Sequence, residues 1–492
     1  PLAWTLGAGL AACAAVAAVS FSLSAVPVAG EYRRLPARGT PAGPSVIFIT
    51  VDTLRADHLG CYGYGRPTSP FVDSLAAGGA RFTDPSAPAA WTKPSTGTLL
   101  TGLYPSRHGA LYHGSRLHLP PGERTLAEAF HAAGYVTAGF VSNPNVKRVF
   151  DFDRGFDEFF DSPVEDTISL AAIRGSYFGR ILMDLLRHEF NWKYENDVRR
   201  MNEHVLAWLE VNHEQPFFLY VHYIDPHIPY DPPAEYRRQF ASPRSGFPLF
   251  NARKERVGRD LYDGEVRYTD DGIRELVEAL YRHGRGEDAL LVVTSDHGEE
   301  FFEHGVLGHG FSLYQPVIHV PLILHGPGIV PGTVVGEPVQ ILDLPATVLD
   351  LAGTGVTRLG DGISFAPLLA APAAGREGPY FLENEFGQNE GDRRSFVFKG
   401  VRSGRWKLVL TEANTYFPPG DPRYGSLALY DLAADPGEER NLIRDEAHRD
   451  LVRSLQERLA AHLAFLDETG FRDAEPAAIS AEILGNLKAL GY

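Results

Sequence analysis

The sequence SVIFITVD, at residues 45–52, is a short apolar run rich in β-branched residues that ends in the carboxylate of Asp52. Such a run is typical of a buried strand in a parallel sheet. The sequence ALLVVTSDHGE, at residues 289–299, repeats this arrangement and carries Asp296 and His297 after its apolar part. Because open α/β sheets bind ligands at the carboxyl ends of their strands, we expect the two acids and the imidazole at one sheet edge.

Two carboxylates and an imidazole at one edge are suitable ligands for a divalent cation. A single aspartate after a strand is usually a turn former or a helix cap. Two such residues, one of them within Asp-His-Gly, favour a shared site. The spacing of these acids along the chain therefore indicates a metal centre built from distant segments.

The sequence WTKPSTGTLLTG, at residues 91–102, predicts a helix with Thr92 at its N-terminus. Pro94 suits the first turn, where no backbone N–H is needed, and Gly102 suits the end of the helix. Free N–H groups and the positive end of the helix dipole would face a phosphate or sulfate held against the Thr92 hydroxyl. A purely structural N-cap is the alternative.

The same segment resembles the sulfatase signature, in which a Cys or Ser is followed at fixed spacing by Pro-Ser, then Arg, then Leu-Thr-Gly. Thr92 occupies the nucleophile position, and Thr96 stands where the signature has Arg. Sulfatases oxidise that Cys or Ser to a formylglycine, and the secondary alcohol of Thr cannot yield this aldehyde. The chain is thus identified as a member of the sulfatase family of the alkaline phosphatase superfamily, in a subgroup that attacks with an unmodified Thr hydroxyl.

The resemblance also implies a set of metal ligands. In the superfamily the Asp after the first strand, the nucleophile and an Asp-His or Asp-Asn pair bind the metal, which assigns Asp52, Thr92, Asp296 and His297 to one divalent ion: Mn, Zn, Ca or Mg. Many sulfatases have a second Asp directly after the first, where this chain has Thr53. Loss of one carboxylate and gain of an imidazole favour a softer transition metal.

Two further histidines match catalytic positions of the family. His227 lies in a His-x-Pro element whose His contacts the transferred group or protonates the leaving oxygen. His309, within Gly-His-Gly, matches the place of a Lys that bridges substrate and nucleophile. With Asp225 these histidines are an alternative site for a second ion. A single ion is favoured, because the spacing from Asp225 to His227 is shorter than in the two-zinc enzymes.

The anion pocket departs from the family. The family's Arg and its Lys-x-His are replaced by Thr96 and by VSNPN at residues 141–145. Asn143 can still donate a neutral hydrogen bond to a non-bridging oxygen, and we assign it, with Lys93 and Asp225, to substrate binding. Three positive or proton-donating groups are therefore missing. A sulfate monoester needs a potent nucleophile, whereas a phosphodiester can be attacked by an alkoxide on a metal, so phosphate esters are favoured as substrates, either diesters or monoesters, with hydrolysis or transfer as the reaction. Sulfatase activity without formylglycine and a catalytically silent binding domain are the alternatives.

Composition restricts the partners. Of 492 residues, 44% are hydrophobic and 22% are charged, which are values of a globular protein. The formal net charge of −16 argues against nucleic acid as a partner. An anionic ester remains compatible, because a bound cation dominates the field of its own site.

Residues 2–30 contain no charged side chain, a length sufficient for a membrane-spanning helix. We therefore expect a transmembrane anchor or signal segment at residues 1–30, which binds the membrane or directs export to the periplasm or another extracytoplasmic space. The Pro- and Gly-rich residues 31–44 form a linker.

Helical and strand patterns alternate after the linker. They predict an α/β domain at residues 45–374, with a mostly parallel sheet covered by helices on both faces, as in alkaline phosphatase. A helical insertion is expected at about 151–215, and a long helix at 264–282. Residues 375–492 predict a small antiparallel sheet followed by an amphipathic helix at 440–469.

Overall fold

The computed structural model describes residues 32–41, 43–111, 118–161, 197–240, 254–372, 378–387, 395–414 and 427–470. The predicted anchor at residues 1–30 lies outside the described residues, as do residues 471–492. Among the helices of the described ranges, none combines the length and the apolar character that crossing a membrane requires.

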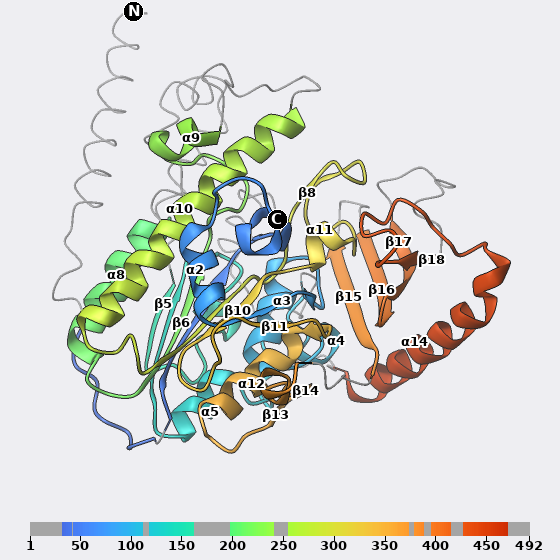
Figure 1. Cartoon of the computed structure of the whole chain (residues 1–492). Helices are drawn as coiled ribbons and strands as arrows, with labels where there is room; N and C mark the ends of the chain where they lie inside the picture. Colours follow the sequence, from blue (N-terminus) through green and yellow to red (C-terminus); the bar gives the residue numbers. More distant parts are fainter. Residues whose placement is uncertain are drawn as a thin grey trace, which may run out of the picture.

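An eight-stranded sheet forms the centre of the molecule, in the order β11-β2-β10-β7-β1-β6-β4-β5 (Figure 1). Strand β1 is parallel to both of its neighbours, β6 and β7, and the parallel pairing continues through β4 to β5. Strand β10 is antiparallel to β7 and β2. The mostly parallel sheet predicted from the sequence is confirmed. Its strands are β1 (Ser45–Val51), β2 (Ala80–Phe82), β4 (Val136–Val141), β5 (Glu158–Asp161), β6 (Phe217–Tyr223), β7 (Ala289–Thr294), β10 (Leu322–His325) and β11 (Thr333–Val335).

The register of the three central strands brings their carboxyl ends together. Thr50 on β1 is paired with His222 on β6 and with Thr294 on β7. Since side chains alternate between the faces of a strand, the residues two positions further along β1 and β7 follow the same direction. These residues are Asp52 and Asp296, so the two acids extend from neighbouring strands at one edge of the sheet.

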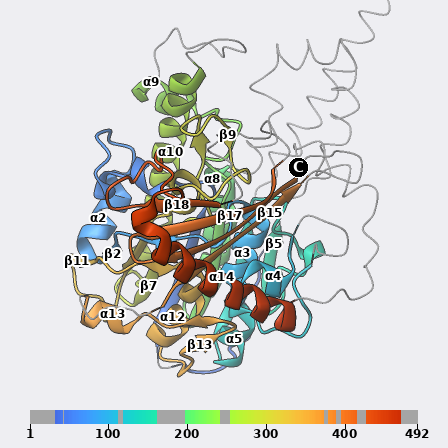
Figure 2. The same cartoon turned by 90° about the vertical axis from the view of Figure 1, so that its right-hand side faces the viewer.

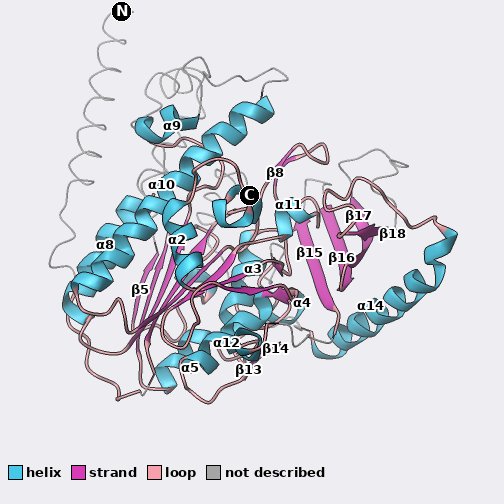
Figure 3. Ribbon diagram, viewed as in Figure 1, coloured by secondary structure: helices cyan, strands magenta, loops and turns pink. Residues whose placement is uncertain are grey.

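Helices cover both faces of the sheet (Figures 1 and 3). On one face, Ile47, Ile49 and Val51 of β1 are buried against α2 (Pro70–Gly78), α8 (Val198–Asn212) and α10 (Lys254–Arg282). On the other face, Val46 and Phe48 are buried against α3 (Thr92–Thr101), α5 (Leu126–Ala132) and α12 (Leu344–Leu351). Strand β1 is apolar on both sides because both of its faces are covered.

The C-terminal part is a second, smaller sheet. Its four antiparallel strands are β15 (Tyr380–Gly387), β16 (Ser395–Ser403), β17 (Trp406–Asn414) and β18 (Leu427–Asp431). Helix α14 (Arg449–Thr469) lies across this sheet, as Figure 2 shows, and buries Leu455 and Leu459 against Val401, Leu408 and Leu429. The predicted C-terminal sheet with a covering helix is confirmed.

The remaining elements are short. The two-residue strands are β3 (Pro85–Ser86), β8 (Glu300–Phe301), β9 (Leu307–Gly308), β12 (Val339–Gln340), β13 (Arg358–Leu359) and β14 (Gly362–Ile363). The short helices are α4 (Pro105–His108), α9 (Ala234–Phe240), α11 (Gln315–Ile318) and α13 (Pro367–Ala370), and 3-10 turns lie at Ala56–His58, Gly60–Tyr62, Arg148–Phe150, Ile341–Asp343 and Glu446–His448.

Three boundaries differ from the sequence-based expectation. Helix α14 begins at Arg449, nine residues after the predicted start at 440, because the N–H of Leu442 donates to the carbonyl oxygen of Leu429 on β18 and a 3-10 turn precedes the helix. Helix α10 begins at Lys254, ten residues before the predicted start at 264, because the polar residues 254–263 give only a weak apolar periodicity. Within the stretch predicted as a helical insertion, β5 pairs in parallel with β4 and forms the edge of the central sheet. Residues 162–196 of that stretch lie outside the described residues.

Candidate active site

The two acids at the sheet edge are completely buried, and hydrogen bonds hold the backbone of Asp52 and the carboxylate of Asp296 in place. The N–H of Asp52 donates to the carbonyl of Tyr223 at 2.9 Å, which continues the pairing of β1 with β6 beyond the strand. Oδ1 of Asp296 accepts from the N–H of His297 at 2.9 Å and from the N–H of Thr53 at 3.4 Å. These bonds fix the Asp296 carboxylate and leave its Oδ2 facing the other site groups.

Thr92 is the first residue of α3 and is fully buried. Trp91 precedes it in an extended conformation, and the helix ends at Gly102, whose φ of 67° is left-handed. A left-handed conformation favours glycine. Gly102, from which the end of the helix was predicted, therefore also allows the chain to leave the helix there. Thr92 therefore sits where the N-terminal end of a helix faces the two acids.

The Thr92 hydroxyl contacts an imidazole. Its Oγ1 lies 3.2 Å from Nε2 of His297, whose Nδ1 lies 2.9 Å from the carbonyl oxygen of Gly298. Because a carbonyl can only accept, Nδ1 carries the proton and Nε2 presents a lone pair toward Thr92. Burial lowers the pKa of His297 to about 4, which keeps the ring neutral at pH 7.

The same nitrogen lies between the two acids. Nε2 of His297 is 3.7 Å from Oδ1 of Asp52 and 3.6 Å from Oδ2 of Asp296. Asp52, Thr92, Asp296 and His297, which the sequence assigned to one metal, are thus gathered around one point. The imidazoles and the His297 N–H hold the pKa of Asp296 below its usual range in spite of burial.

A fifth side chain joins this group. Asp52, Asp296 and His222 offer ligand atoms that all lie within 4.8 Å of one another. Nε2 of His222 is 3.7 Å from Oδ2 of Asp296, and neither ring nitrogen of this buried histidine makes a hydrogen bond to a described residue. Oδ2 of Asp296 likewise has no hydrogen-bond partner among the described residues. Two buried carboxylates this close together need a compensating positive charge. The residues present therefore fit a divalent cation.

Asn143 also belongs to the site. Its Nδ2 donates to Oδ2 of Asp52 at 2.5 Å and lies 3.4 Å from Oγ1 of Thr92. Its Oδ1 accepts from the N–H of Asn145 at 2.8 Å, which fixes the orientation of the amide. An amide N–H group therefore stands beside the hydroxyl at the position where the family resemblance expects a Lys.

Three imidazoles line up next to the hydroxyl. The ring of His309 is centred 4.5 Å from that of His297 and 4.9 Å from that of His227. Nδ1 of His309 lies 2.9 Å from Oε1 of Glu299, and the other oxygen of Glu299 accepts from Tyr230 at 2.9 Å. A buried carboxylate thus fixes the orientation of the His309 ring.

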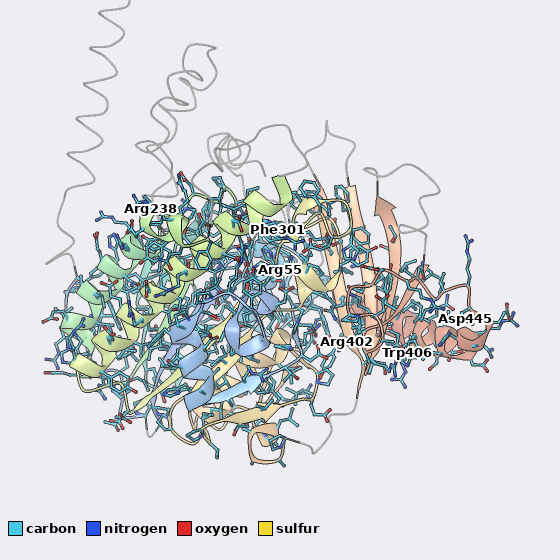
Figure 4. The ribbon with its side chains drawn as sticks, turned by 45° about the horizontal axis from the view of Figure 1, so that its top comes forward. Arg55, Arg238, Phe301, Arg402, Trp406 and Asp445 are labelled. Atoms are coloured by element: carbon cyan, nitrogen blue, oxygen red, sulfur yellow. The ribbon has the colours of Figure 1, made fainter. Side chains whose placement is uncertain are left out.

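The turn that carries Glu299 is supported from the end of β1. The buried Arg55 donates from Nη1 to the carbonyl oxygen of Glu299 at 2.9 Å and pairs with Glu303 at 2.6 Å. Its guanidinium lies 5.6 Å from the centre of the Phe301 ring, and Figure 4 shows the two side chains together. Burial opposes the charge of Arg55, but Asp57 and Glu303 raise its pKa.

Two predicted substrate-binding residues lie apart from these contacts. The carboxylate of Asp225 accepts from the N–H of Val198 at 3.0 Å, at the start of α8. Lys93 is fully buried, its Nζ lies 3.5 Å from the centre of the Phe150 ring, and it has no hydrogen-bond partner among the described residues. Burial lowers the pKa of Lys93 to about 7. Within the described ranges, the cluster of acids and imidazoles close enough together for an ion is that of Asp52, His222 and Asp296.

Sequence reasoning missed two members of the site. The sequence analysis assigns no role to His222, although a polar residue at the end of an apolar strand next to β1 is a sign of a site residue. Glu299 follows the Asp-His-Gly sequence directly, but its partner His309 is brought to it only by the turn between β8 and β9.

Known proteins are similar over most of the chain. A family model described as Sulfatase matches residues 44–354, and one described as N-sulphoglucosamine sulphohydrolase, C-terminal, matches residues 302–464. Arylsulfatase A of Homo sapiens is 28% identical over 451 residues, which cover 81% of this chain and 83% of the relative.

Solved structures share the fold. The phosphonate monoester hydrolase of Agrobacterium radiobacter has a TM-score of 0.67 at 22% identity, covering 86% of this chain and 96% of its own. A structure solved in complex with its substrate D-glucosamine-2-N,6-O-disulfate has a TM-score of 0.66 at 18% identity, covering 88% of this chain and 99% of its own. The fold is thus used by proteins whose names refer to different esters.

Proposed function

Because the chain belongs to the sulfatase family and is a hydrolase of that family, we propose that it cleaves phosphate esters with Thr92 as an unmodified nucleophile. The observation that carries the proposal is the buried Thr92 hydroxyl at the start of α3, 3.2 Å from the unprotonated nitrogen of His297. Because Thr cannot become a formylglycine, we propose that this oxygen attacks directly. The acceptor of the transferred group is water or another alcohol.

The second part of the proposal concerns the cation. Asp52, Asp296, His297 and the Thr92 oxygen would hold one divalent ion, and His222 is close enough to the two acids to take part. When bound, the ion would lower the pKa of the Thr92 hydroxyl and draw electron density from the ester. A set with two imidazoles favours Zn or Mn over Ca or Mg.

His227 and His309 are proposed to serve opposite ends of the reaction. Attack by Thr92 Oγ1, which releases its proton to solvent, forms the bond from Oγ1 to phosphorus and breaks the bond from phosphorus to the leaving oxygen, which takes a proton from His227. Water then attacks phosphorus and gives a proton to His227, and the bond to Oγ1 breaks as Oγ1 takes a proton back from solvent. His309, oriented by Glu299, holds a non-bridging oxygen.

The groups around the hydroxyl favour phosphorus over sulfur. Thr96 and Asn145 stand where the family resemblance expects Arg and His, and both are buried and uncharged. A sulfate monoester depends on a stronger nucleophile than an alcohol, whereas a phosphate ester accepts an alcohol nucleophile beside a cation. Sulfate ester hydrolysis is therefore the second candidate, supported by the named sulfatases among the relatives.

Substrate binding is proposed for Asn143 and Lys93. Asn143 already directs an N–H toward the Thr92 oxygen at 3.4 Å, from which it can reach an oxygen of the transferred group. Lys93 is a buried cation next to the nucleophile in the chain, and an anionic ester would supply the charge that its surroundings lack. Asp225 contacts the start of α8, so we propose that it positions His227, two residues later, through that helix.

An ester panel tests the proposal. The full chain is purified, stripped with a chelator, reloaded with Zn, Mn, Mg or Ca, and assayed on nitrophenyl phosphate, bis-nitrophenyl phosphate, a nitrophenyl phosphonate and nitrophenyl sulfate. We expect a phosphate ester to be the fastest substrate and Zn or Mn to be the most effective ion. Faster turnover of the sulfate ester, under every ion, would reject the preference.

A further inference from the structure

Strand β15 of the C-terminal sheet reaches the site that the central sheet builds. Its residue Asn384 is completely buried. Oδ1 accepts from the N–H of Ala90 at 3.3 Å, and Nδ2 donates to the carbonyl oxygen of Gly310 at 2.8 Å. Because the first partner can only donate and the second can only accept, the orientation of the amide is fixed.

The two partners of Asn384 belong to the two segments that carry the proposed chemistry. Ala90 is two residues before Thr92, and Gly310 directly follows His309. The N–H of Gly310 also donates to the carbonyl oxygen of Ala90 at 2.8 Å, so the two segments are joined directly as well as through Asn384. The side chain thus closes a ring of hydrogen bonds between them.

Neighbouring residues of β15 reinforce this ring. The indole N–H of Trp91 donates to the carbonyl oxygen of Glu385 at 3.1 Å, and its ring meets that of Phe386 edge-on at 5.5 Å. Phe386 also packs on Gly310, where an added Cβ would lie 2.9 Å from the ring and the φ of 82° is left-handed. Only a glycine fits there, which lets the backbone after His309 approach β15 closely.

The C-terminal sheet is itself attached to the main domain at other points. Arg402 on β16 forms an ion pair with Asp84, and Figure 4 labels Arg402 on the C-terminal sheet. Lys407 on β17 donates to the carbonyl oxygen of Leu313 at 2.7 Å and pairs with Glu438. The contacts with Asp84 and Leu313 attach β16 and β17 to the main domain through residues other than Asn384.

From these contacts we infer that Asn384 is a positioning residue, which sets the distance between the Thr92 nucleophile and His309 from the C-terminal sheet. The inference deepens the proposed function and rests on it for its catalytic consequence. Its structural part, that Asn384 fixes the loop carrying His309, stands on the hydrogen bonds alone. The C-terminal sheet is accordingly part of the active-site construction rather than a cover.

The test replaces Asn384 by Leu, which has the same number and branching of side-chain heavy atoms and makes neither hydrogen bond. The matched control is Asn202→Leu, because Asn202 is equally buried and bridges Tyr223, Gly272 and Glu275 away from the His309 loop. Hydrogen exchange followed by mass spectrometry should show faster exchange in the peptide around residues 303–314 for Asn384→Leu and not for Asn202→Leu. Unchanged exchange in that peptide would overturn the inference, whether or not the chain cleaves any ester.

Kinetics on the best substrate supply the second measurement. Misplacing a catalytic group by about 1 Å lowers turnover by about 100-fold, so kcat of Asn384→Leu should fall by about that factor at unchanged metal content. In a His309→Ala background the same substitution should lower kcat much less, because no imidazole is left there for Asn384 to position. An equal loss in both backgrounds, or the same loss in Asn202→Leu, would contradict the positioning role. If wild-type protein cleaves no ester, the proposed function fails while the exchange experiment still decides the role of Asn384.

Discussion

Oγ1 of Thr92 and Nε2 of His297 lie 3.2 Å apart, although the residues are 205 positions apart in the sequence. The contact joins the start of α3 to the end of β7 and places a hydroxyl on the unprotonated side of an imidazole. Two buried acids flank the same nitrogen. A hydroxyl so placed can become a nucleophile once a cation compensates the acids.

Removal of an acid should remove the ion. We expect Asp296→Ala to lose the stoichiometric metal that the wild-type protein carries, because one of two buried carboxylates is deleted from the site. The measurement is metal analysis by mass spectrometry after gel filtration of both proteins. An Asp296→Ala protein that retains a full equivalent of metal contradicts the assignment.

His222 should contribute to the affinity of the same site for its metal ion. Replacing it by Gln should weaken binding of Zn by about 10- to 100-fold, the range found when a group next to a metal is removed. The control is His204→Gln, since His204 is also buried but contacts Tyr32 and Phe160 instead. Titration with Zn in a calorimeter measures both. Equal affinities for wild type and His222→Gln would exclude His222 from the site.

The proposed acid should matter most for poor leaving groups. His227→Ala should lower turnover of an alkyl phosphate by about 10² to 10⁴ and that of a nitrophenyl phosphate much less, because nitrophenolate leaves without a proton. Steady-state rates on the two substrates give the comparison. Equal losses would remove the acid role and favour a metal-binding or structural one.

Replacing Lys93 should stabilise the fold and weaken the binding of an anionic ester. A fully buried ammonium without a hydrogen-bond partner in the described structure destabilises the fold, so Lys93→Met should raise the free energy of unfolding by about 1–3 kcal/mol. The same change should raise KM for an anionic ester. Denaturant unfolding and steady-state kinetics measure the two effects, and a Met variant with wild-type KM would count against the proposed contact with substrate.

The stability of the fold should depend on pH through Asp197, which caps the start of α8. Burial and the neighbouring Asp225 raise the pKa of Asp197 from 3.8 to about 6. Because the folded state prefers the protonated acid, the destabilisation is absent below about pH 4, develops between pH 4 and 6, and persists above. Asp197→Asn should therefore stabilise the protein by about 1–2 kcal/mol at pH 8 and by almost nothing at pH 4. Thermal unfolding at both pH values checks this; a gain that is larger at pH 4 has the wrong sign.

The sequence was sufficient to predict the fold class and three residues of the site, Asp52, Thr92 and Asp296. Two apolar runs, each followed by an acid, predicted parallel strands with a common edge, and Pro94 and Gly102 predicted the helix that begins at Thr92. These signals are local, and their meaning does not depend on distant partners. The positions of Asp52, Asp296 and Thr92 follow from them.

Other members of the site depend on long-range packing. His222 joins the acids only through the register of β6 with β1, which pairs it with Thr50. Asn384 meets Ala90 across 294 positions, and an asparagine within an edge strand has no local pattern that reveals such a partner. Sequence periodicity tells which face of a strand a residue occupies, but not which loop of another domain will contact it.

The nucleophile can be tested in three variants. Thr92→Val keeps the shape of the side chain and removes the hydroxyl, and it should lower turnover by at least about 10³-fold with the fold intact. Thr92→Ser keeps a hydroxyl and should retain much of the activity. Thr92→Cys recreates the residue that is oxidised in sulfatases but lacks the Arg that Thr96 replaces, so weak sulfatase activity at most is expected. Val and Ser variants of equal activity would exclude the hydroxyl from catalysis.

The most direct measurement is to trap the covalent intermediate. Wild-type protein is mixed with its best phosphate ester, quenched with acid within one turnover, digested and examined by mass spectrometry. The account predicts a phosphoryl group on Thr92 in the peptide that contains residues 91–102, and its absence in Thr92→Val treated in the same way. Turnover without any phosphate on that peptide, at every quench time, would contradict the central claim.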